Sequence, residues 1–581
     1  MASWKTALPF LLPSLAGFVV FSIIPMIMQI FVSLTSWDGL SELTLFSDFS
    51  GFMDRFYVGI ENYKEILTSK EFYQVIGNTL EFVILYIPLM LIASMIVALI
   101  LNSHVKGVGI FRVLYYIPVI TSWVAGALIW KWVLSPEYGA INNILALFGI
   151  EGPSWLQSSK WAMPAIVLAS VWKDMGYFGL MLMSGLQGIN QEYYDAAAID
   201  GAGKIKQFTR ITLPLLTPTL FFVLIISLIN SFQLFTQIMI MTPDGGPLGS
   251  TMVMVERIYK CGFRYYEMGT AAAYSWILFA ILLLLTMVQM KLQNKWVNAT
   301  PSSLTGLKQR RIIGKVAFYV LGLLVAIIVC IPFYWMIITS LKGRGAIMSI
   351  PVEWIPKEPT LDAYKKLFAM PEFVGSIFNS FYVSVLCTAV RLLCAAMAAF
   401  ALTKIPFKGR NAVFGIYVTA LMIPSQITFI PLFIIMTNMH LTNSLNAFML
   451  LQLFNAFAIF MMRQKMMTIN DAYIEAAVID GASMWRIFFK IILPMSGSAM
   501  ATLAILAFMD MWNDYLLPLV LLSERSKFTL PLLLSTLSGQ YKNQYNLTMA
   551  GALISIIPIL IVYIFAQKYF KEGLTVGGVK G

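Results

Sequence analysis

The feature that most constrains this chain is a stretch of twenty residues that occurs twice. The first copy spans residues 195–214 and the second spans 475–494, at a constant offset of 280 residues. Ten of the twenty paired positions are identical, and they include Asp200 and Asp480. A repeat of this kind means that the chain contains two similar units, so any fold assigned to it must be built twice.

Each copy predicts two short helices joined by a tight turn. The copies begin with runs of alanine, which forms helices well and whose small side chain lets another surface approach closely. Gly201 and Gly481 then follow an aspartate, and glycine accepts the positive φ that a tight turn often needs. An ordinary amphipathic loop helix would explain one such copy, but it explains two matched copies poorly.

The rest of the chain is strongly apolar. Of its 581 residues, 59% are hydrophobic and the mean hydropathy is +0.78, values typical of a polytopic membrane protein and not of a soluble globule. Apolar runs near the length of roughly 20 residues that a spanning helix needs recur about twelve times, which predicts an all-α fold. The predicted spans are residues 7–34, 74–102, 113–134, 162–187, 216–241, 269–290, 317–341, 375–402, 413–437, 446–467, 498–521 and 546–567.

The charged residues predict how the chain is oriented. The net charge is +12, and the basic residues gather in the loops on the side that also holds both repeats and both termini. The first loop on the opposite side is acidic. By the positive-inside rule the basic side is cytoplasmic, so the charge reflects membrane topology and no nucleic acid is expected as a partner. The four cysteines and two histidines are scattered and form no metal or disulfide spacing.

A second internal match extends the duplication beyond the repeat. Asn78-Thr79 matches Asn379-Ser380 at an offset of 301, so the first half carries about 21 extra residues, which we expect within 138–160. Six spans per half give both halves the same orientation, a parallel repeat. The predicted organisation is a first domain at 1–292, a polar cytoplasmic linker at 293–316 and a second domain at 317–581.

The repeated Ala-Ala…Gly…Leu-Pro loop resembles the signature of permease subunits of binding-protein-dependent ABC importers. Both halves are similar to the carbohydrate branch, the maltose and glycerol-phosphate type: the first through Trp172-Lys173 and 242–247, the second through 512–514 and its ending 577–581. The departures are the fusion itself, Asp195 in place of the usual glutamate, and Pro243. The resemblance implies the type I ABC importer permease fold, with both permeases on one chain.

The resemblance also implies partners in the bacterial cytoplasmic membrane. Each loop, 188–215 and 468–497, would be a coupling helix seated in one of two cytoplasmic ATPase subunits, and the tail 569–581 would insert between them. An extracytoplasmic sugar-binding protein would deliver the solute. The coupling residues implied are Asp195, Ala196, Ala197, Asp200, Gly201, Glu475, Ala476, Ala477, Asp480, Gly481 and Lys580.

No enzyme or cofactor is expected on the chain itself. Gly201-Ala202-Gly203-Lys204 superficially resembles a phosphate-binding P-loop, but Ala198 stands where the first glycine is required and Ile205 follows the lysine. ATP and Mg would therefore be bound by the partner ATPase, and the surrounding lipid is the remaining partner.

Ionisable residues inside spans point to function, because inserting them costs about 2.5–3.5 kcal/mol each. Lys173 and Asp174 lie in the fourth predicted span, Arg391 in the eighth, and Asp510 and Asp514 in the eleventh. Lys173 and Asp174 either face substrate, pair with other spans or snorkel near a helix end. For the lone Arg391 we expect that it ties helices together.

The fifth span offers a polar stripe, because Ser227, Asn230 and Ser231 share one helical face. These positions, with Ser170 and Tyr177 on the fourth span, match sugar-contacting positions in the maltose-type permease. Hydroxyls take neutral hydrogen bonds and an aromatic ring covers a sugar's apolar face; polar contact between helices is the alternative. The predicted substrate residues, mainly from the first half, are Ser170, Lys173, Asp174, Tyr177, Ser227, Asn230, Ser231 and Gln233.

The favoured function is uptake of a carbohydrate, a di- or oligosaccharide, by alternating access. One alternative is the same machine carrying another solute, such as glycerol phosphate, a peptide or an amino acid. A secondary transporter with six plus six spans is a different class, which would respond to an ion gradient and ignore vanadate.

Overall fold

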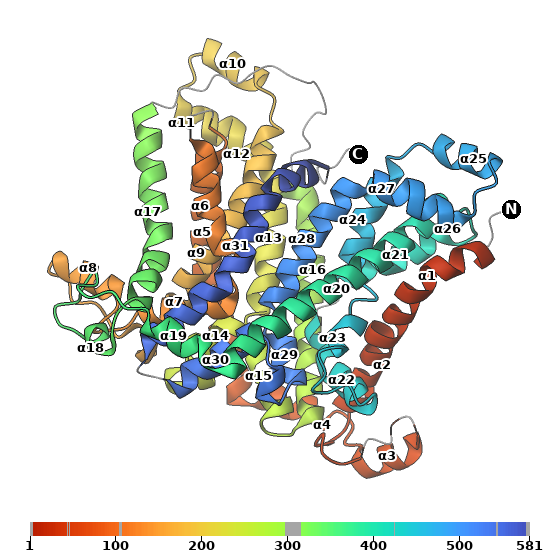
Figure 1. The fold of residues 1–581 in the computed structure, drawn as a ribbon, viewed down its shortest axis with the longest axis horizontal. Helices are drawn as coiled ribbons and strands as arrows, with labels where there is room; N and C mark the ends of the chain where they lie inside the picture. Colours follow the sequence, from red (N-terminus) through yellow and green to blue (C-terminus); the bar gives the residue numbers. More distant parts are fainter. Residues whose placement is uncertain are drawn as a thin grey trace.

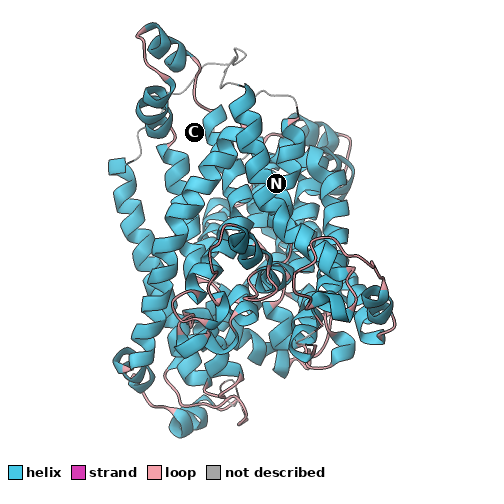
Figure 2. Cartoon of the chain, turned by 90° about the vertical axis from the view of Figure 1, so that its left-hand side faces the viewer, coloured by secondary structure: helices cyan, strands magenta, loops and turns pink. Residues whose placement is uncertain are grey.

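The computed structural model describes residues 4–42, 45, 47–103, 107–296, 315–422, 425–541 and 544–576. These residues are mostly helical, and Figure 2 shows helices throughout. One isolated bridge, between Thr35 and Tyr57, is the β pairing found within the described ranges. The apolar runs form helices because a helix satisfies every backbone donor and acceptor within one segment, as a membrane requires.

The first half contains six spans joined by shorter helices. Its spans are built from α1 (Trp4–Phe18) with α2 (Ile24–Ser33), α5 (Lys70–Leu101), α6 (Val108–Ile120) with α7 (Trp123–Val133), α9 (Ala162–Gln187), α13 (Thr217–Phe232) and α16 (Met268–Trp296). The connecting helices are α3 (Phe49–Phe56), α4 (Glu61–Thr68), α8 (Ala140–Leu147), α10 (Glu192–Ile199), α11 (Lys204–Gln207), α12 (Leu213–Leu215), α14 (Thr236–Met241) and α15 (Met254–Phe263).

The second half repeats this order. Its spans are built from α17 (Lys315–Ser340), α20 (Pro371–Lys404), α21 (Arg410–Thr419) with α22 (Ser425–Asn438), α23 (Ala447–Leu450) with α24 (Ala456–Met467), α28 (Gly497–Asn513) and α31 (Tyr545–Val576). The connecting helices are α18 (Arg344–Ile347), α19 (Asp362–Phe368), α25 (Ala472–Ile479), α26 (Met484–Ile487), α27 (Leu493–Met495), α29 (Leu516–Leu521) and α30 (Leu530–Gln540).

Several spans are broken. Within the described ranges, seven helical segments are each long and apolar enough to cross a membrane. Three further pairs of consecutive helices are long and apolar enough only when the two helices are taken together, and these pairs are bent by 98°, 66° and 79°. The two remaining predicted spans, 413–437 and 446–467, fall on α21–α22 and on α23–α24, and residues 451–455 interrupt the second pair. Hydropathy detects these runs but does not show where a helix stops, because it measures composition alone.

The two halves interlock through their first spans. Helix α1 packs against α20 and α2 against α22, while α17 packs against α6 and α7 as well as α31. Tyr115 donates a hydrogen bond to the Gly322 carbonyl at 2.7 Å, and Trp132 Nε1 donates to Thr339 Oγ1 at 2.9 Å. Each half therefore covers one face of its neighbour's opening span.

The repeats share one side of the molecule. Figure 1 shows α10 and α25 at the same, upper side, together with the start of α1 and the end of α31. Helices α3 and α4 lie at the bottom of this view and α8 and α18 at its left edge, away from α10 and α25. This arrangement is the one predicted from the charges; the assignment of the upper side to the cytoplasm stays a prediction.

Candidate functional site

The two repeated loops end their first helix in the same backbone turn. Gly201 has φ 73° and Gly481 has φ 77°, the left-handed conformation that glycine adopts at little cost. The amide of Ala202 donates to the Ala197 carbonyl at 2.8 Å, and the equivalent bond from Ala482 to Ala477 measures 2.9 Å. These bonds form the C-terminal Schellman motif of α10 and α25. The predicted tight turn is confirmed in both copies.

In each loop, the same two positions connect the first helix with the segment that leads into the fifth span. In the first loop the hydroxyls of Tyr194 and Thr212 are 2.9 Å apart and buried. In the second loop the equivalent residues are Ile474 and Ile492, which are buried in one apolar cluster. At these equivalent positions, a buried hydrogen bond in the first half is thus replaced by burial in a shared apolar cluster in the second.

Each loop exposes an isoleucine side chain among charged residues. Ile199 is 87% exposed and Ile479 is 85% exposed, at equivalent positions next to the turns. The acidic coupling residues and both glycines are exposed as well, as are Ala196 and Ala476, whereas Ala197 is half-buried and Ala477 is buried against its own half. Exposed apolar side chains rimmed by charge are typical of a protein interface. Lys580 lies outside the described residues.

Lys173 holds the break between α6 and α7. Its Nζ donates to the carbonyls of Pro118, Val119 and Thr121 at 3.0, 3.1 and 2.6 Å, and lies 5.3 Å from the Trp123 ring centroid. These carbonyls end α6, where the helix interior no longer satisfies them. Of the roles left open for Lys173, the structure shows contact with another span.

The break receives a fourth donor from the other half. Asn513, at the end of α28, donates to the Ile120 carbonyl at 3.1 Å. The four carbonyls from residue 118 to 121 are thereby all bonded, by one side chain from each half. The break between α6 and α7 is thus bonded by side chains from both halves of the chain.

Two more predicted residues of α9 face a neighbouring span or open space. Asp174 accepts a hydrogen bond from the Tyr86 hydroxyl at 2.7 Å, which links α9 to α5. Tyr177 lies three residues further on and is 39% exposed. Tyr86 was not predicted, because nothing in its own stretch of sequence indicates a partner 88 residues away.

The predicted serines are buried, whereas the predicted asparagine and glutamine are more exposed. Ser170, Ser227 and Ser231 are buried, and their hydroxyls donate to carbonyls of their own helices at 2.8, 3.0 and 2.7 Å. Asn230 is exposed on α13, and Gln233, just past the end of that helix, is partly buried. Among the eight predicted substrate residues, Tyr177 and Asn230 are therefore the two most open to a solute, and their binding role stays a prediction.

The second half carries a buried arginine with two partners. Arg391 on α20 donates from Nε to Gln452 Oε1 and from Nη2 to Asp510 Oδ2, each at 2.8 Å. The prediction that Arg391 ties helices together is confirmed. Asp510 was not predicted as a substrate residue, although the 280-residue offset places it opposite Asn230.

The two fifth spans meet where they break. Phe235 and Tyr515 are also 280 residues apart, and their ring centroids lie 6.3 Å from each other. Contact between equivalent residues means that the pseudo-symmetry axis of the two halves passes between them. Asn230 and Asp510, each five residues earlier, lie on either side of this axis.

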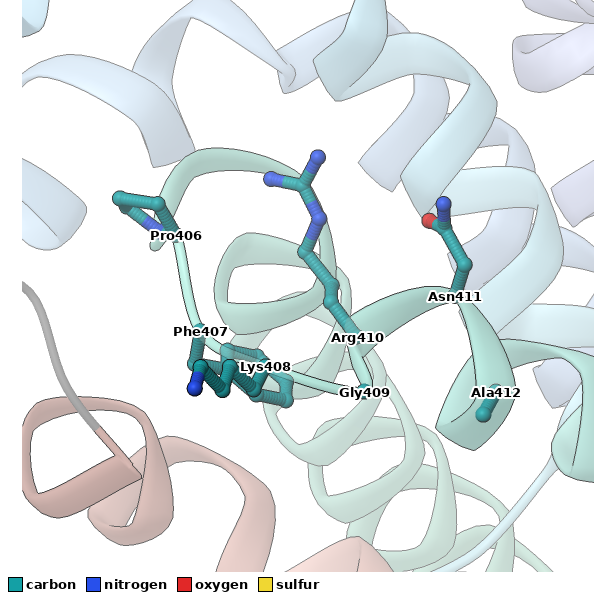
Figure 3. Close-up of a pocket in the computed structure, with 7 residues that line it drawn as sticks. All are labelled: Pro406, Phe407, Lys408, Gly409, Arg410, Asn411 and Ala412. Atoms are coloured by element: carbon teal, nitrogen blue, oxygen red, sulfur yellow. The ribbon is translucent and has the colours of Figure 1, made fainter.

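Two hollows lie away from these residues. One, of about 520 Å³, is formed by the loop 406–412 between α20 and α21, and Figure 3 shows Arg410 pointing away from Phe407 and Lys408. The other, of about 400 Å³, involves both halves through Lys131, Gln157, Thr242 and Tyr545, among others. Neither hollow contains a predicted substrate residue.

Comparison with known proteins identifies the family. Residues 67–299 and 391–576 each match the family described as "Binding-protein-dependent transport system inner membrane component". The probable ABC transporter permease protein YesP of Bacillus subtilis (strain 168) is 34% identical over 293 residues, 50% of this chain and 90% of that protein.

Two further relatives match slightly less than half of this chain over nearly their full length. The arabinooligosaccharides transport system permease protein AraQ of Halalkalibacterium halodurans is 38% identical over 260 residues, 44% of this chain and 93% of AraQ. The trehalose/maltose transport system permease protein MalF of Thermococcus litoralis is 34% identical over 284 residues, 48% of this chain and 91% of MalF. This chain belongs to the family of binding-protein-dependent transport system inner membrane components, non-enzymatic permeases, and it carries the family's unit twice.

Proposed function

We propose that this chain forms the transmembrane pathway of an ATP-driven importer for a di- or oligosaccharide that an extracytoplasmic binding protein delivers. The observation that carries the proposal is the pair of loops on one side of the molecule, with the same turn and the same exposed isoleucine tip. Two relatives named for arabinooligosaccharides and for trehalose/maltose support a carbohydrate as the solute.

The loops are the points where two separate ATPase subunits would act. Ile199 and Ile479 would enter a cleft on each subunit, and the tail that includes Lys580 would reach between the subunits. ATP and Mg are bound by those partners. Since α10 is hydrogen-bonded to the segment that leads into its fifth span, and α25 shares an apolar cluster with the equivalent segment, movement of α10 and α25 would be transmitted to α13 and α28.

The solute would pass between the fifth spans. In the structure this route is crossed by the Phe235–Tyr515 contact, so spreading of α13 and α28 would open it. Tyr177, Asn230 and the free side of Asp174 offer a ring face and neutral or charged acceptors for sugar hydroxyls. Ser170, Ser227 and Ser231 add acceptor oxygens behind them, and Lys173 keeps the neighbouring break in place.

Site-specific crosslinking tests the docking. A cysteine introduced by Ile199→Cys or Ile479→Cys should crosslink to the ATPase in membranes. Leu147→Cys provides a matched control, because Leu147 is an exposed apolar residue of α8, a helix that lies away from both loops in Figure 1. Three of the four native cysteines, Cys261, Cys387 and Cys394, are buried, which keeps the background low.

Transport in vesicles tests the energy source. Sugar uptake should require ATP and a loaded binding protein, and vanadate should stop it. Uptake driven by an ion gradient and unaffected by vanadate would instead make the chain a secondary transporter, and it would contradict the proposal. Crosslinking of Leu147→Cys alone would place the ATPase on the wrong side.

A further inference from the structure

An acidic side chain is exposed inside the spans of the second half. The carboxylate of Asp510 lies in the last turn of α28, and its side chain is 60% exposed. A charged group in a membrane span avoids lipid and faces either the bundle interior or a water-filled space. The exposed surface of Asp510 therefore lines the route for the solute and not the lipid boundary.

The carboxylate is held in one orientation. Its Oδ2 bonds to Arg391 Nη2 at 2.8 Å, and the Arg391 side chain is only 8% exposed. Gln452, buried in the interruption between α23 and α24, bonds the other edge of the guanidinium. The broken fourth span of the second half thus supplies the group that orients the arginine, which in turn orients Asp510.

The location of Asp510 matches that of a predicted substrate residue. Asp510 and Asn230 occupy equivalent positions on α28 and α13, and both are exposed. The contact between Phe235 and Tyr515 brings the two helices together five residues further on. A solute that touches Asn230 on one side of the pseudo-symmetry axis therefore meets Asp510 on the other.

The groups around this route favour one charge class of solute. Asp510 and Asp174 present acceptor oxygens, which suit the hydroxyl donors of a sugar. In the described spans, Arg391 forms an ion pair with Asp510, and Lys173, next to Asp174 in the sequence, donates to three backbone carbonyls. A carboxylate or phosphate on the solute would be repelled by these carboxylate oxygens, while both cations are buried and already bonded to protein oxygens.

We propose that Asp510 is a substrate-binding residue contributed by the second half, and that the carbohydrate carried is neutral, without uronate or phosphate groups. This inference rests on the proposed function, and it adds a second-half contact to a site predicted mainly from the first half. The sugar is then held from both sides, so both units must close around it before transport.

The test uses the full chain with its ATPase in lipid nanodiscs. Saturation-transfer NMR, without the binding protein, compares malto- and arabino-oligosaccharides with oligogalacturonides as probes. The Asp510→Asn variant keeps the shape but weakens acceptance of hydroxyl hydrogens. The Glu71→Gln variant is the control, because it breaks a partly buried ion pair, Glu71–Arg257 at 2.7 Å, outside the route.

The wild type should bind a neutral oligosaccharide and no uronate. Asp510→Asn should weaken binding about tenfold or more, as expected for loss of a hydrogen bond to a charged group, and lower sugar transported per ATP hydrolysed in vesicles. Glu71→Gln should leave both quantities unchanged. A merely structural role for Asp510 would reduce uptake and ATP hydrolysis together.

Each contrary result has its own meaning. Wild-type binding and an unchanged ratio of sugar to ATP in Asp510→Asn would remove the second-half contact and leave the proposed importer intact. Binding of oligogalacturonide as tight as that of neutral sugar would overturn the neutral class. No binding and no uptake of any sugar by the wild type would overturn the proposed function itself.

Discussion

Lys173 shows how one side chain can make a broken helix stable in a membrane. A bend of 98° between α6 and α7 leaves carbonyls without helical partners, and no water is available in the hydrocarbon to replace them. One ammonium with three donors satisfies three of those carbonyls. The residue type is suited to this role because the flexible lysine stem lets a single charge reach several acceptors.

We expect Lys173→Met to destabilise the protein. The substitution keeps the length of the side chain but leaves three buried carbonyls unbonded, and one such group costs about 1–3 kcal/mol. Thermal unfolding followed by tryptophan fluorescence in detergent should show a lower melting temperature. Lys64→Met, at an exposed lysine on α4, is the control and should melt as the wild type does. Unchanged melting combined with loss of sugar uptake would instead show that the amine serves the solute.

At the scale of the element, the coupling loops depend on one backbone angle and not on a tight fit. A Cβ placed on Gly201 or Gly481 would meet no atom within 4 Å, so space does not explain the glycines. Their positive φ explains the glycines, because most residues with a side chain are strained in this conformation and asparagine is among the few that tolerate it. The turn sets the direction in which each loop leaves its first helix, and hence where Ile199 and Ile479 point.

We expect Gly201→Ala and Gly481→Ala to weaken coupling, with a strain of about 1–2 kcal/mol for each left-handed alanine. Asparagine tolerates this conformation, so Gly201→Asn should keep most of the activity. The measurement is sugar taken up per ATP hydrolysed at equal expression. Gly77→Ala is the control, because Gly77 is helical and also has free space around it. Equal coupling in all four variants would show that the turn is not needed.

Local features could be predicted from the sequence and long-range ones could not. The loops were found because glycine, alanine and proline act within a few residues, and most spans because a membrane helix needs a long apolar run. The interruption at 451–455 was not predicted from the sequence. The side chain that bonds Gln452 within it belongs to Arg391, 61 residues away, and a local pattern cannot indicate such a partner. Asp510 could have been found by applying the 280-residue offset to Asn230, whereas Tyr86 carried no such signal.

At the scale of the whole molecule, the fusion joins two units that already hold each other. Trp132 of the first half stacks on Tyr545 of the second at 3.9 Å, and Trp172 donates to the Val329 carbonyl at 3.0 Å. On the other flank, Phe10 in α1 packs on Trp485 of the second coupling loop, with ring centroids 4.1 Å apart. Two relatives named as permease proteins match about half of this chain over nearly their full length, so the unit also occurs singly.

We therefore expect residues 1–296 and 315–581, produced in one cell as two separate chains, to assemble into a working transporter. Each half needs the other to cover its first span, because α1 and α2 lie on α20 and α22 while α17 lies on α6 and α7. An affinity tag on the first chain should recover both in equal amounts, with sugar uptake near that of the fused protein. Either chain produced alone should be degraded or aggregate, since its exposed apolar flank has no partner. Recovery of the tagged first half as a stable monomer, free of the second, would show that the contacts seen across the two flanks do not hold the molecule together and that the link does.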